Sequence, residues 1–113
     1  AMVEMTGARS GQPRTAPLIY VQLETEPERM ALIATNWGRQ RFPAWYHNLK
    51  AHPEAYGTVK GLRRMYRAHE ASQGEYGPYW RAAVETYPGY ESYRKRIVGR
   101  PIPIMILDLQ GTS

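Results

Sequence analysis

The stretch PAWYHNLK, residues 43–50, decides how this chain is organised, because it predicts a short helix between two groups of strands. Pro43 suits the first turn of a helix, because backbone N–H groups in that turn have no partner within the helix and proline lacks this group. One apolar stripe of this helix is made of Trp45, Tyr46 and Leu49. Because a proline disfavours helical backbone in the residue before it, we expect the helix to end before Pro53.

Strand-like segments lie on both sides of the predicted helix. Before it, runs rich in Leu, Ile, Tyr and Val predict strands at 3–6, 15–23 and 30–35, with a charged hairpin loop at 24–29. After it, two strands paired around Gly61 and a closing apolar strand are predicted at 56–60, 64–71 and 103–109.

Two more helices are predicted in the last third of the chain. SQGE, residues 72–75, has the spacing of a capping box. One face of a helix of about three turns then carries Tyr76, Tyr79, Trp80, Ala83, Val84 and Tyr87. A second short helix follows Pro88. With about five or six strands, two or three helices and no βαβ alternation, the sequence predicts an α+β fold with a mainly antiparallel sheet or barrel.

Length and composition limit the function classes. The 113 residues suit one domain, residues 1–113. Apolar content of 42% and charged content of 22% are typical of a globular protein. The absence of cysteine excludes disulfides, thiolate metal sites and cysteine nucleophiles. No signal peptide or membrane-spanning run is recognisable, so we expect a cytoplasmic location.

The charge balance favours an anionic ligand. Fifteen Lys and Arg against ten Asp and Glu give a formal net charge of +5. Twelve of the fifteen bases are Arg, which binds phosphate and carboxylate in a planar, bidentate way. The ligand could be a nucleotide, a phosphorylated cofactor or nucleic acid, although the signatures of RNA-recognition domains are missing. A merely soluble basic surface is an equal alternative on charge alone.

A tyrosine cluster, YPGYESY at residues 87–93, marks a candidate site. Tyr87, Tyr90 and Tyr93 recur every three residues and therefore crowd one flank of a short helix. Such rings can wall a pocket for a flat, conjugated ligand, with a phenol donating a hydrogen bond to a developing oxyanion. The alternative is a row of half-buried packing residues.

Two other candidate sites carry less weight. The turn GARSGQPR, residues 7–14, could hold a phosphate through its exposed N–H groups and its two Arg side chains, although an ordinary turn is the simpler interpretation. It lacks the Gly-Lys-Ser/Thr ending of a P-loop. No metal site is expected, since His47, His52 and His69 do not have metal-ligand spacing.

Taken in order, these segments resemble the deazaflavin-dependent nitroreductase family, actinobacterial oxidoreductases that use reduced coenzyme F-420 within the flavin-binding split β-barrel superfamily. The resemblance runs from Thr6 to Leu109. The stretches that carry it are TGARSGQPR (6–14), ATNWG (34–38), PAWYHNLKAHP (43–53), YPGYESY (87–93) and RPIPI (100–104). The Pro-x-Trp-Tyr-x-Asn-Leu block together with the Tyr-Pro-x-Tyr block is specific, whereas each alone would not be.

The resemblance implies which residues bind the coenzyme, an 8-hydroxy-5-deazaflavin with a phosphodiester and an oligoglutamate tail. On the phosphate and tail side these are Arg9, Ser10, Gln12, Pro13 and Arg14. Around the ring and its linker they are Ala34, Thr35, Asn36, Gly38, Pro43, Trp45, Tyr46 and Asn48. The residues implied to face the acceptor, and to act in catalysis, are Tyr90, Tyr87 and Tyr93.

The implied activity is hydride transfer from reduced coenzyme F-420 to an electron-poor acceptor such as a quinone, a nitroaromatic or an activated enone. The alternatives are a non-catalytic protein that binds coenzyme F-420 or a fatty-acyl ligand, and a flavin mononucleotide (FMN) enzyme on the same barrel. A monomer or homodimer is expected.

The chain departs from the family pattern in three places. Arg9 stands where a Lys is usual, and Trp37 stands in place of a common Gly, which adds bulk near the coenzyme channel. Against the family pattern, the N-terminal helical extension is expected to be either absent or removed, and peripheral membrane association would be expected through that missing segment.

Overall fold

The computed structural model describes residues 1–97 and 99–110, except for the side chain of Trp37. The strands are β1 (Met2–Thr6), β2 (Pro13–Pro17), β3 (Val21–Leu23), β4 (Glu26–Ile33), β5 (Glu54–Val59), β6 (Leu62–Glu70) and β7 (Ile104–Leu109). The helices are the short 3₁₀ helix η1 (Asn36–Gly38) and the α-helices α1 (Ala44–Ala51), α2 (Gln73–Thr86) and α3 (Gly89–Arg96). The predicted α+β class is confirmed, with seven strands in the described residues against the five or six expected.

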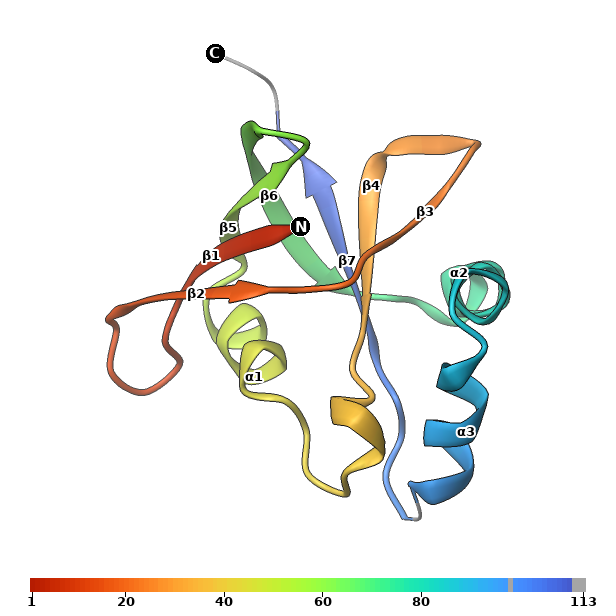
Figure 1. Cartoon of the computed structure of the whole chain (residues 1–113). Helices are drawn as coiled ribbons and strands as arrows, with labels where there is room; N and C mark the ends of the chain where they lie inside the picture. The colour runs from red at the N-terminus through yellow and green to blue at the C-terminus, as the bar shows by residue number, and fades with distance from the viewer. Residues whose placement is uncertain (98, 111–113) are drawn as a thin grey trace.

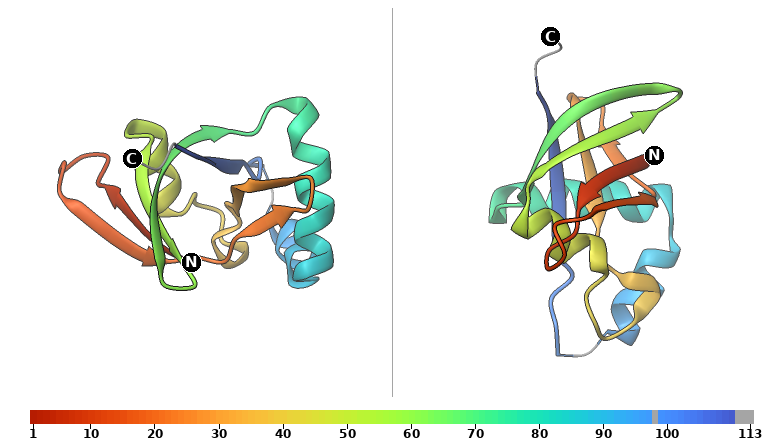
Figure 2. Two further views of the ribbon diagram at one scale, coloured as in Figure 1. Left: turned by 90° about the horizontal axis from the view of Figure 1, so that it is seen from above. Right: turned by 90° about the vertical axis from the view of Figure 1, so that its left-hand side faces the viewer.

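The seven strands form one curved sheet in the order β2-β1-β5-β6-β7-β4-β3. Every strand pair in the described part of the chain is antiparallel, as predicted. Seen from above, the sheet bends round an interior in the manner of a barrel (Figure 2). It does not close, since β2 and β3 are its two edges. Helix α1 lies below β1 and β6, α2 lies beyond β3 and β4, and α3 lies below α2, beside η1 (Figure 1).

The predicted strand at 15–23 is wrong, because the chain changes edges within it. Pro17, which has no N–H to offer a sheet, ends β2, and the chain then crosses to the opposite edge and pairs Val21 with Ala31 of β4. The predicted hairpin loop at 24–29 is also too long. Because Leu23 pairs with Glu26, only two residues form the turn and β4 begins at Glu26.

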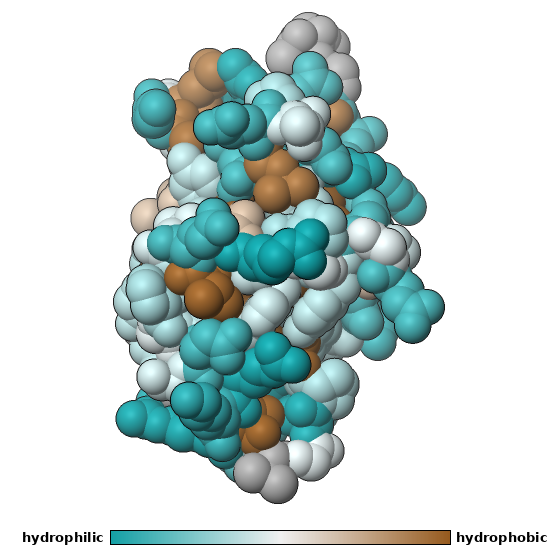
Figure 3. Space-filling model, turned by 90° about the vertical axis from the view of Figure 1, so that its right-hand side faces the viewer, coloured by the Kyte–Doolittle hydropathy of each residue, from teal (hydrophilic) through white to brown (hydrophobic). Residues whose placement is uncertain are grey.

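Two core clusters lie on opposite faces of the sheet. The inner cluster includes Val3, Met30, Leu32, Leu49, Met105 and Leu107, all at most 1% exposed. The outer cluster packs α2 and α3 against the sheet and includes Val21, Tyr79, Trp80, Ala83, Tyr90, Ile104 and Ile106. The surface over these helices is mainly hydrophilic, with only small, separate hydrophobic areas (Figure 3). The two helices therefore cover the outer cluster.

Helix α2 begins with the predicted capping box. The Ser72 hydroxyl accepts a hydrogen bond from the Glu75 N–H at 3.3 Å, and the Glu75 carboxylate accepts one from the Ser72 N–H at 2.9 Å. Helix α2 is longer than the three turns expected, at 14 residues. No helix in residues 1–97 and 99–110 is both long and apolar enough to cross a membrane.

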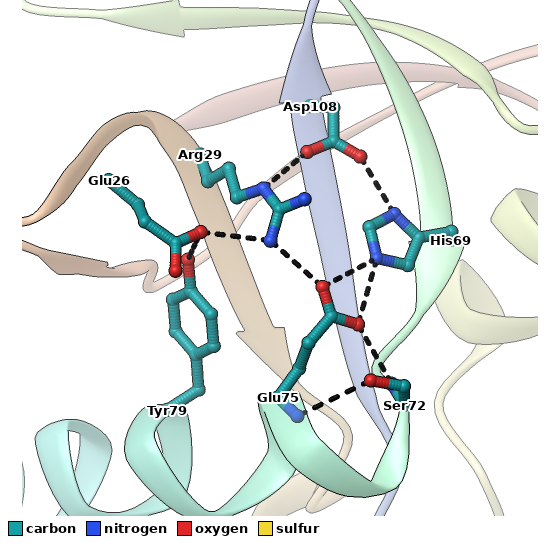
Figure 4. Close-up of polar contacts among 7 residues, drawn as sticks. All are labelled: Glu26, Arg29, His69, Ser72, Glu75, Tyr79 and Asp108. Atoms are coloured by element: carbon teal, nitrogen blue, oxygen red, sulfur yellow. Dashed lines mark hydrogen bonds and ion pairs between the residues drawn. The ribbon is translucent and has the colours of Figure 1, made fainter.

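A polar cluster fastens the start of α2 to the sheet (Figure 4). Its members are Glu26, Arg29, His69, Ser72, Glu75, Tyr79 and Asp108. The Arg29 guanidinium contacts Glu26 and Glu75 at 2.8 Å and Asp108 at 2.6 Å. His69 faces Asp108 through Nδ1 at 2.7 Å and Glu75 through Nε2 at 3.2 Å. These contacts join β4, β6 and β7 to α2.

Acid is expected to weaken this attachment through Glu75. The Ser72 N–H, assisted by His69, lowers the pKa of Glu75 from 4.5 to about 2. Because the folded-state pKa is depressed, Glu75 stabilises the fold fully above pH 4.5, and this contribution is lost as the pH falls towards 2. At pH 7 we expect Glu75→Gln to lower the free energy of unfolding by about 1.5–3 kcal/mol, measured by urea denaturation.

The exposed Glu85 on the same helix supplies the control, and Glu85→Gln should change stability by no more than about 0.5 kcal/mol. The difference between wild type and Glu75→Gln should shrink between pH 5 and pH 2. A difference that stays constant over this range would contradict the role given to the carboxylate.

Candidate functional site

A cavity of about 610 Å³ lies between the edge strand β2, the end of β4, and helices α1 and α3. This volume is within the range of roughly 300–1,000 Å³ that is usual for small-molecule sites. From the first part of the chain the lining residues are Ala1, Met5, Arg14, Thr15, Ala16, Pro17, Leu18 and Ile19. From the remainder they are Ile33, Thr35, Asn36, Pro43, Ala44, Trp45, Asn48 and Tyr90. The lining thus combines a large apolar surface with a few polar groups.

The cavity brings together residues from four of the five stretches that carry the family resemblance, and none from residues 100–104. Predicted site residues that line it are Arg14, Thr35, Asn36, Pro43, Trp45, Asn48 and Tyr90. Predicted site residues outside the lining are Arg9, Ser10, Gln12, Pro13, Ala34, Gly38, Tyr46, Tyr87 and Tyr93.

The Gly7–Arg14 turn is a closed loop attached to α1. Gly7 N–H donates to the Gln12 carbonyl at 2.8 Å, and Ala8 N–H donates to the Asn48 side-chain oxygen of α1 at 2.9 Å. A Cβ on Gly7 would lie 2.7 Å from the Ser10 hydroxyl oxygen, so a side chain at this position would force that hydroxyl to move. The side chains from Arg9 to Arg14 are exposed beside the cavity. The turn therefore offers cationic groups at its edge, and Asn48 fixes its position.

The Ser10 hydroxyl organises this turn from within. It accepts hydrogen bonds from the Gln12 N–H and from the Arg14 guanidinium, both at 3.1 Å. A second guanidinium N–H of Arg14 donates to the Pro13 carbonyl at 3.0 Å. Arg14 is thus held at the cavity wall by its own turn, while Arg9 and Gln12 extend into solvent.

Helix α1 has two different faces. Pro43 precedes the helix as its N-cap, in extended backbone, and Trp45 and Asn48 face the cavity. Tyr46 points away from the cavity and is 6% exposed. Its ring stacks on that of Phe42, with 5.0 Å between the ring centres, and its hydroxyl donates to the Glu70 carboxylate at 2.6 Å. The single stripe predicted for Trp45, Tyr46 and Leu49 is therefore split between cavity and core.

The turn from β4 into η1 forms the back of the cavity. Ala34 and Thr35 are buried, and Asn36 has a left-handed backbone with φ of +48°. Gly38 has φ of +81°, and a Cβ there would lie 3.2 Å from Arg96 and 3.3 Å from Tyr93 of α3. Glycine thus allows α3 to pack closely on this turn. The Trp37 side chain, expected near the coenzyme channel, lies outside the described residues.

The three tyrosines of α3 and its approach form one cluster. The hydroxyls of Tyr87 and Tyr93 are hydrogen-bonded at 3.0 Å, and the Tyr90 ring packs edge-on against both, at 5.1 and 6.3 Å. Burial, followed by these two neighbours, raises the pKa of Tyr90 to about 12, so the phenol keeps its proton at neutral pH. Among the described residues the Tyr90 hydroxyl has no hydrogen-bond partner, which leaves it free to donate to a ligand.

Comparison with known proteins identifies the family. A sequence model described as F420H(2)-dependent quinone reductase matches residues 1–108. The chain belongs to the F420H(2)-dependent quinone reductase family. It is 32% identical over 109 residues to the F420H(2)-dependent quinone reductase Rv1261c of Mycobacterium tuberculosis (strain ATCC 25618 / H37Rv), covering 94% of this chain and 70% of that protein. The resemblance to coenzyme F-420 enzymes of actinobacteria is thereby confirmed.

Solved structures of similar proteins have the same fold as this family member. The structure of the F420-H2 dependent reductase FDR-A superposes with a TM-score of 0.83 at 32% identity, covering 95% of this chain and 91% of that one. A structure described as a domain-swapped dimer has the same TM-score and identity, with 95% and 78% covered. The expected relation to the split β-barrel is thus confirmed, although the sheet of this chain is open.

The apolar wall of the cavity in this quinone reductase family member is not predicted by the sequence. Ala16, Pro17, Leu18 and Ile19 line it, yet they stand inside a run that reads as one continuous strand. Pro17 was the one available signal, because proline tends to mark a strand end at a sheet edge. In the described residues no group of three His, Asp or Glu side chains is placed to hold a metal ion.

Proposed function

We propose that this chain transfers a hydride from reduced coenzyme F-420 to a quinone-type acceptor, and that both bind in the 610 Å³ cavity. The observation that carries the proposal is the convergence on one cavity of Arg14, Trp45, Asn48 and Tyr90, which come from three separate segments: the 7–14 turn, α1 and α3. The names of the family and of its relatives favour this activity over a non-catalytic coenzyme or fatty-acyl binder, and coenzyme F-420 over FMN.

The residues of the cavity fit the coenzyme by their chemistry. We assign Arg9, Ser10, Gln12, Pro13 and Arg14 to its phosphate and tail, since an exposed pair of guanidinium groups attracts anions. We assign Thr35, Asn36, Pro43, Trp45 and Asn48 to the ring, which needs apolar faces and hydrogen-bonding edges. Ala34, Gly38 and Tyr46 support this wall from behind. When bound, the reduced coenzyme supplies the hydride.

Tyr90 is the residue that we assign to the acceptor. As a neutral phenol with an unused donor, it can stabilise negative charge that builds on a quinone oxygen during reduction. Tyr87 and Tyr93 hold its ring in place through edge-on packing and their mutual hydrogen bond. The apolar wall made by Leu18 and Ile19 limits the access of water to the reacting groups.

The assembly and location of the protein are secondary proposals. One domain over residues 1–113 is supported by the two core clusters, which share a single sheet. A homodimer is supported by the domain-swapped dimer among the structural neighbours. The cytoplasmic location and the peripheral membrane association remain predictions.

A fluorescence titration with oxidised coenzyme F-420, run beside the same titration with FMN, tests the coenzyme assignment. We expect saturable binding of coenzyme F-420, weakening as salt rises because exposed ion pairs are screened. Arg14→Ala should weaken this binding by about 1.5–3 kcal/mol, the range for hydrogen bonds to charged groups.

Arg81→Ala serves as the control, because Arg81 is exposed on α2, away from the cavity lining. It should leave the affinity unchanged. Micromolar binding of FMN with no response to coenzyme F-420 would refute the assignment.

A further inference from the structure

Arg100, in the segment between α3 and β7, binds backbone carbonyls of the turn that follows β4. One terminal nitrogen of its guanidinium donates to the carbonyls of Ala34 at 3.1 Å and Pro101 at 2.9 Å. The other donates to the carbonyls of Thr35 at 3.1 Å and Arg39 at 2.9 Å. A single side chain therefore holds both ends of the 34–39 turn, about 65 residues away in sequence.

The same guanidinium reaches the start of helix α1. Its central carbon lies 4.8 Å from the centre of the Phe42 ring, a cation–π distance. Phe42 immediately precedes Pro43, the N-cap of α1, and it also stacks on Tyr46 within that helix. Arg100 thus contacts both segments that form the back and side of the cavity, the 34–39 turn and the entry to α1.

Arg100 adds to a small set of hydrogen bonds that hold the 34–39 turn, among them Ala34 N–H to the Pro103 carbonyl and the Asn36 side-chain amide to the Arg41 carbonyl. Within it, Gly38 N–H donates to Thr35 and Arg39 N–H to Asn36, at 3.0 and 3.1 Å. Asn36 carries the strain of a left-handed backbone at a position that lines the cavity. The Arg100 donors add hydrogen bonds to the carbonyls of Ala34 and Arg39, and they give a second donor to the Thr35 carbonyl, which already accepts from Gly38 N–H.

Placing a cation here has a cost. Burial lowers the pKa of Arg100, and within residues 1–97 and 99–110 no carboxylate lies at ion-pair distance from it. Its Nε atom is buried and has no hydrogen-bond partner among the described residues. The shape of the guanidinium explains why an arginine suits this buried position. The planar guanidinium can serve several carbonyls at fixed positions, whereas a Lys ammonium acts as a point charge on a flexible stem.

We propose that Arg100 is a positioning residue, which fixes the 34–39 turn and the entry to α1 so that Thr35, Asn36 and Trp45 stand in the geometry required for the coenzyme ring. The inference rests on the proposed function, since it takes the ligand of this cavity to be coenzyme F-420. Arg100 acts through the backbone it holds and does not line the cavity.

The test compares Arg100→Lys, which keeps the charge, with wild type and with Arg81→Lys as the control at an exposed position. Two quantities are measured: the Kd for oxidised coenzyme F-420, and hydrogen exchange at the Gly38 and Arg39 amides, whose hydrogen bonds define the turn. We expect the Kd of Arg100→Lys to rise about tenfold or more, since small displacements of positioning groups have effects of this size. The two amides should exchange faster while the amides of β7 keep their protection.

Three outcomes would overturn the inference. If wild type binds the coenzyme and Arg100→Lys binds it equally well, the inference alone fails. If amide protection from hydrogen exchange is lost throughout the sheet as much as in the turn, Arg100 stabilises the whole fold and does not position the turn specifically. If wild type does not bind the coenzyme, the proposed function fails and the inference fails with it. If Arg100→Lys does not fold, the same measurements are made on Arg100→Gln. This variant keeps two N–H donors on its side-chain amide without the buried charge.

Discussion

Replacing Tyr90 by Phe should lower the turnover of quinone acceptors about 10²–10³-fold, the usual effect of removing one well-placed donor to an oxyanion. The ring of Tyr90 would remain, because it is 5% exposed and packs against Tyr87 and Tyr93. The variant loses only the hydroxyl, which at a pKa of about 12 is protonated at neutral pH. The affinity for coenzyme F-420 should therefore stay nearly unchanged, while kcat falls.

Two further variants sharpen this experiment. Tyr56→Phe is the control, since Tyr56 lies on β5 outside the cavity lining, under the guanidinium of Arg63 at 3.8 Å. Tyr87→Phe breaks the hydrogen bond to Tyr93. It should lower the turnover of quinones less than Tyr90→Phe does and more than Tyr56→Phe does. If Tyr90→Phe reduces quinones at the wild-type rate, the phenol serves only in packing.

Replacing Trp80 by Ala should destabilise the protein by about 3–5 kcal/mol, measured by urea denaturation. Trp80 is 8% exposed in the outer core cluster, stacks on Tyr76 at 6.3 Å and donates from its indole N–H to Glu91 at 3.4 Å. The substitution removes this packing between α2 and α3 and leaves a cavity behind. A loss of this size is a large part of the roughly 5–15 kcal/mol that holds a typical domain folded.

Trp45→Ala supplies a contrast within the same chain. Trp45 is half-buried at the cavity, so its loss should weaken coenzyme binding more than it lowers stability. An unchanged melting temperature in Trp80→Ala would show that the packing face given to α2 is wrong.

The sequence predicts the helices of this fold better than its strands, for reasons visible in particular residues. Ser72 and Glu75 satisfy each other's backbone groups locally, and the aromatic stripe after them needs only helical spacing. The crossing between β2 and β3 depends instead on which distant strand each residue pairs with. Nothing in the apolar run from Ala16 to Val21 distinguishes one strand from two, apart from Pro17.

The candidate site divides in the same way. Tyr90 and the α1 residues Trp45 and Asn48 could be singled out, because their types and spacing form recognisable motifs. Arg100 could not be given its role, since the carbonyls it binds carry no side-chain signal and stand far away in sequence. The inward turn of Tyr46 was likewise hidden, because an aromatic residue suits a cavity wall and a core equally.

The measurement that tests hydride transfer most directly follows the oxidation of reduced coenzyme F-420 by a soluble quinone in the presence of the protein. We expect oxidation that depends on the protein, saturates with the quinone, and consumes one coenzyme for each quinone reduced, because a hydride carries two electrons. Oxidation no faster than in the absence of protein, from a protein that binds the oxidised coenzyme, would contradict this expectation and would identify a non-catalytic binder.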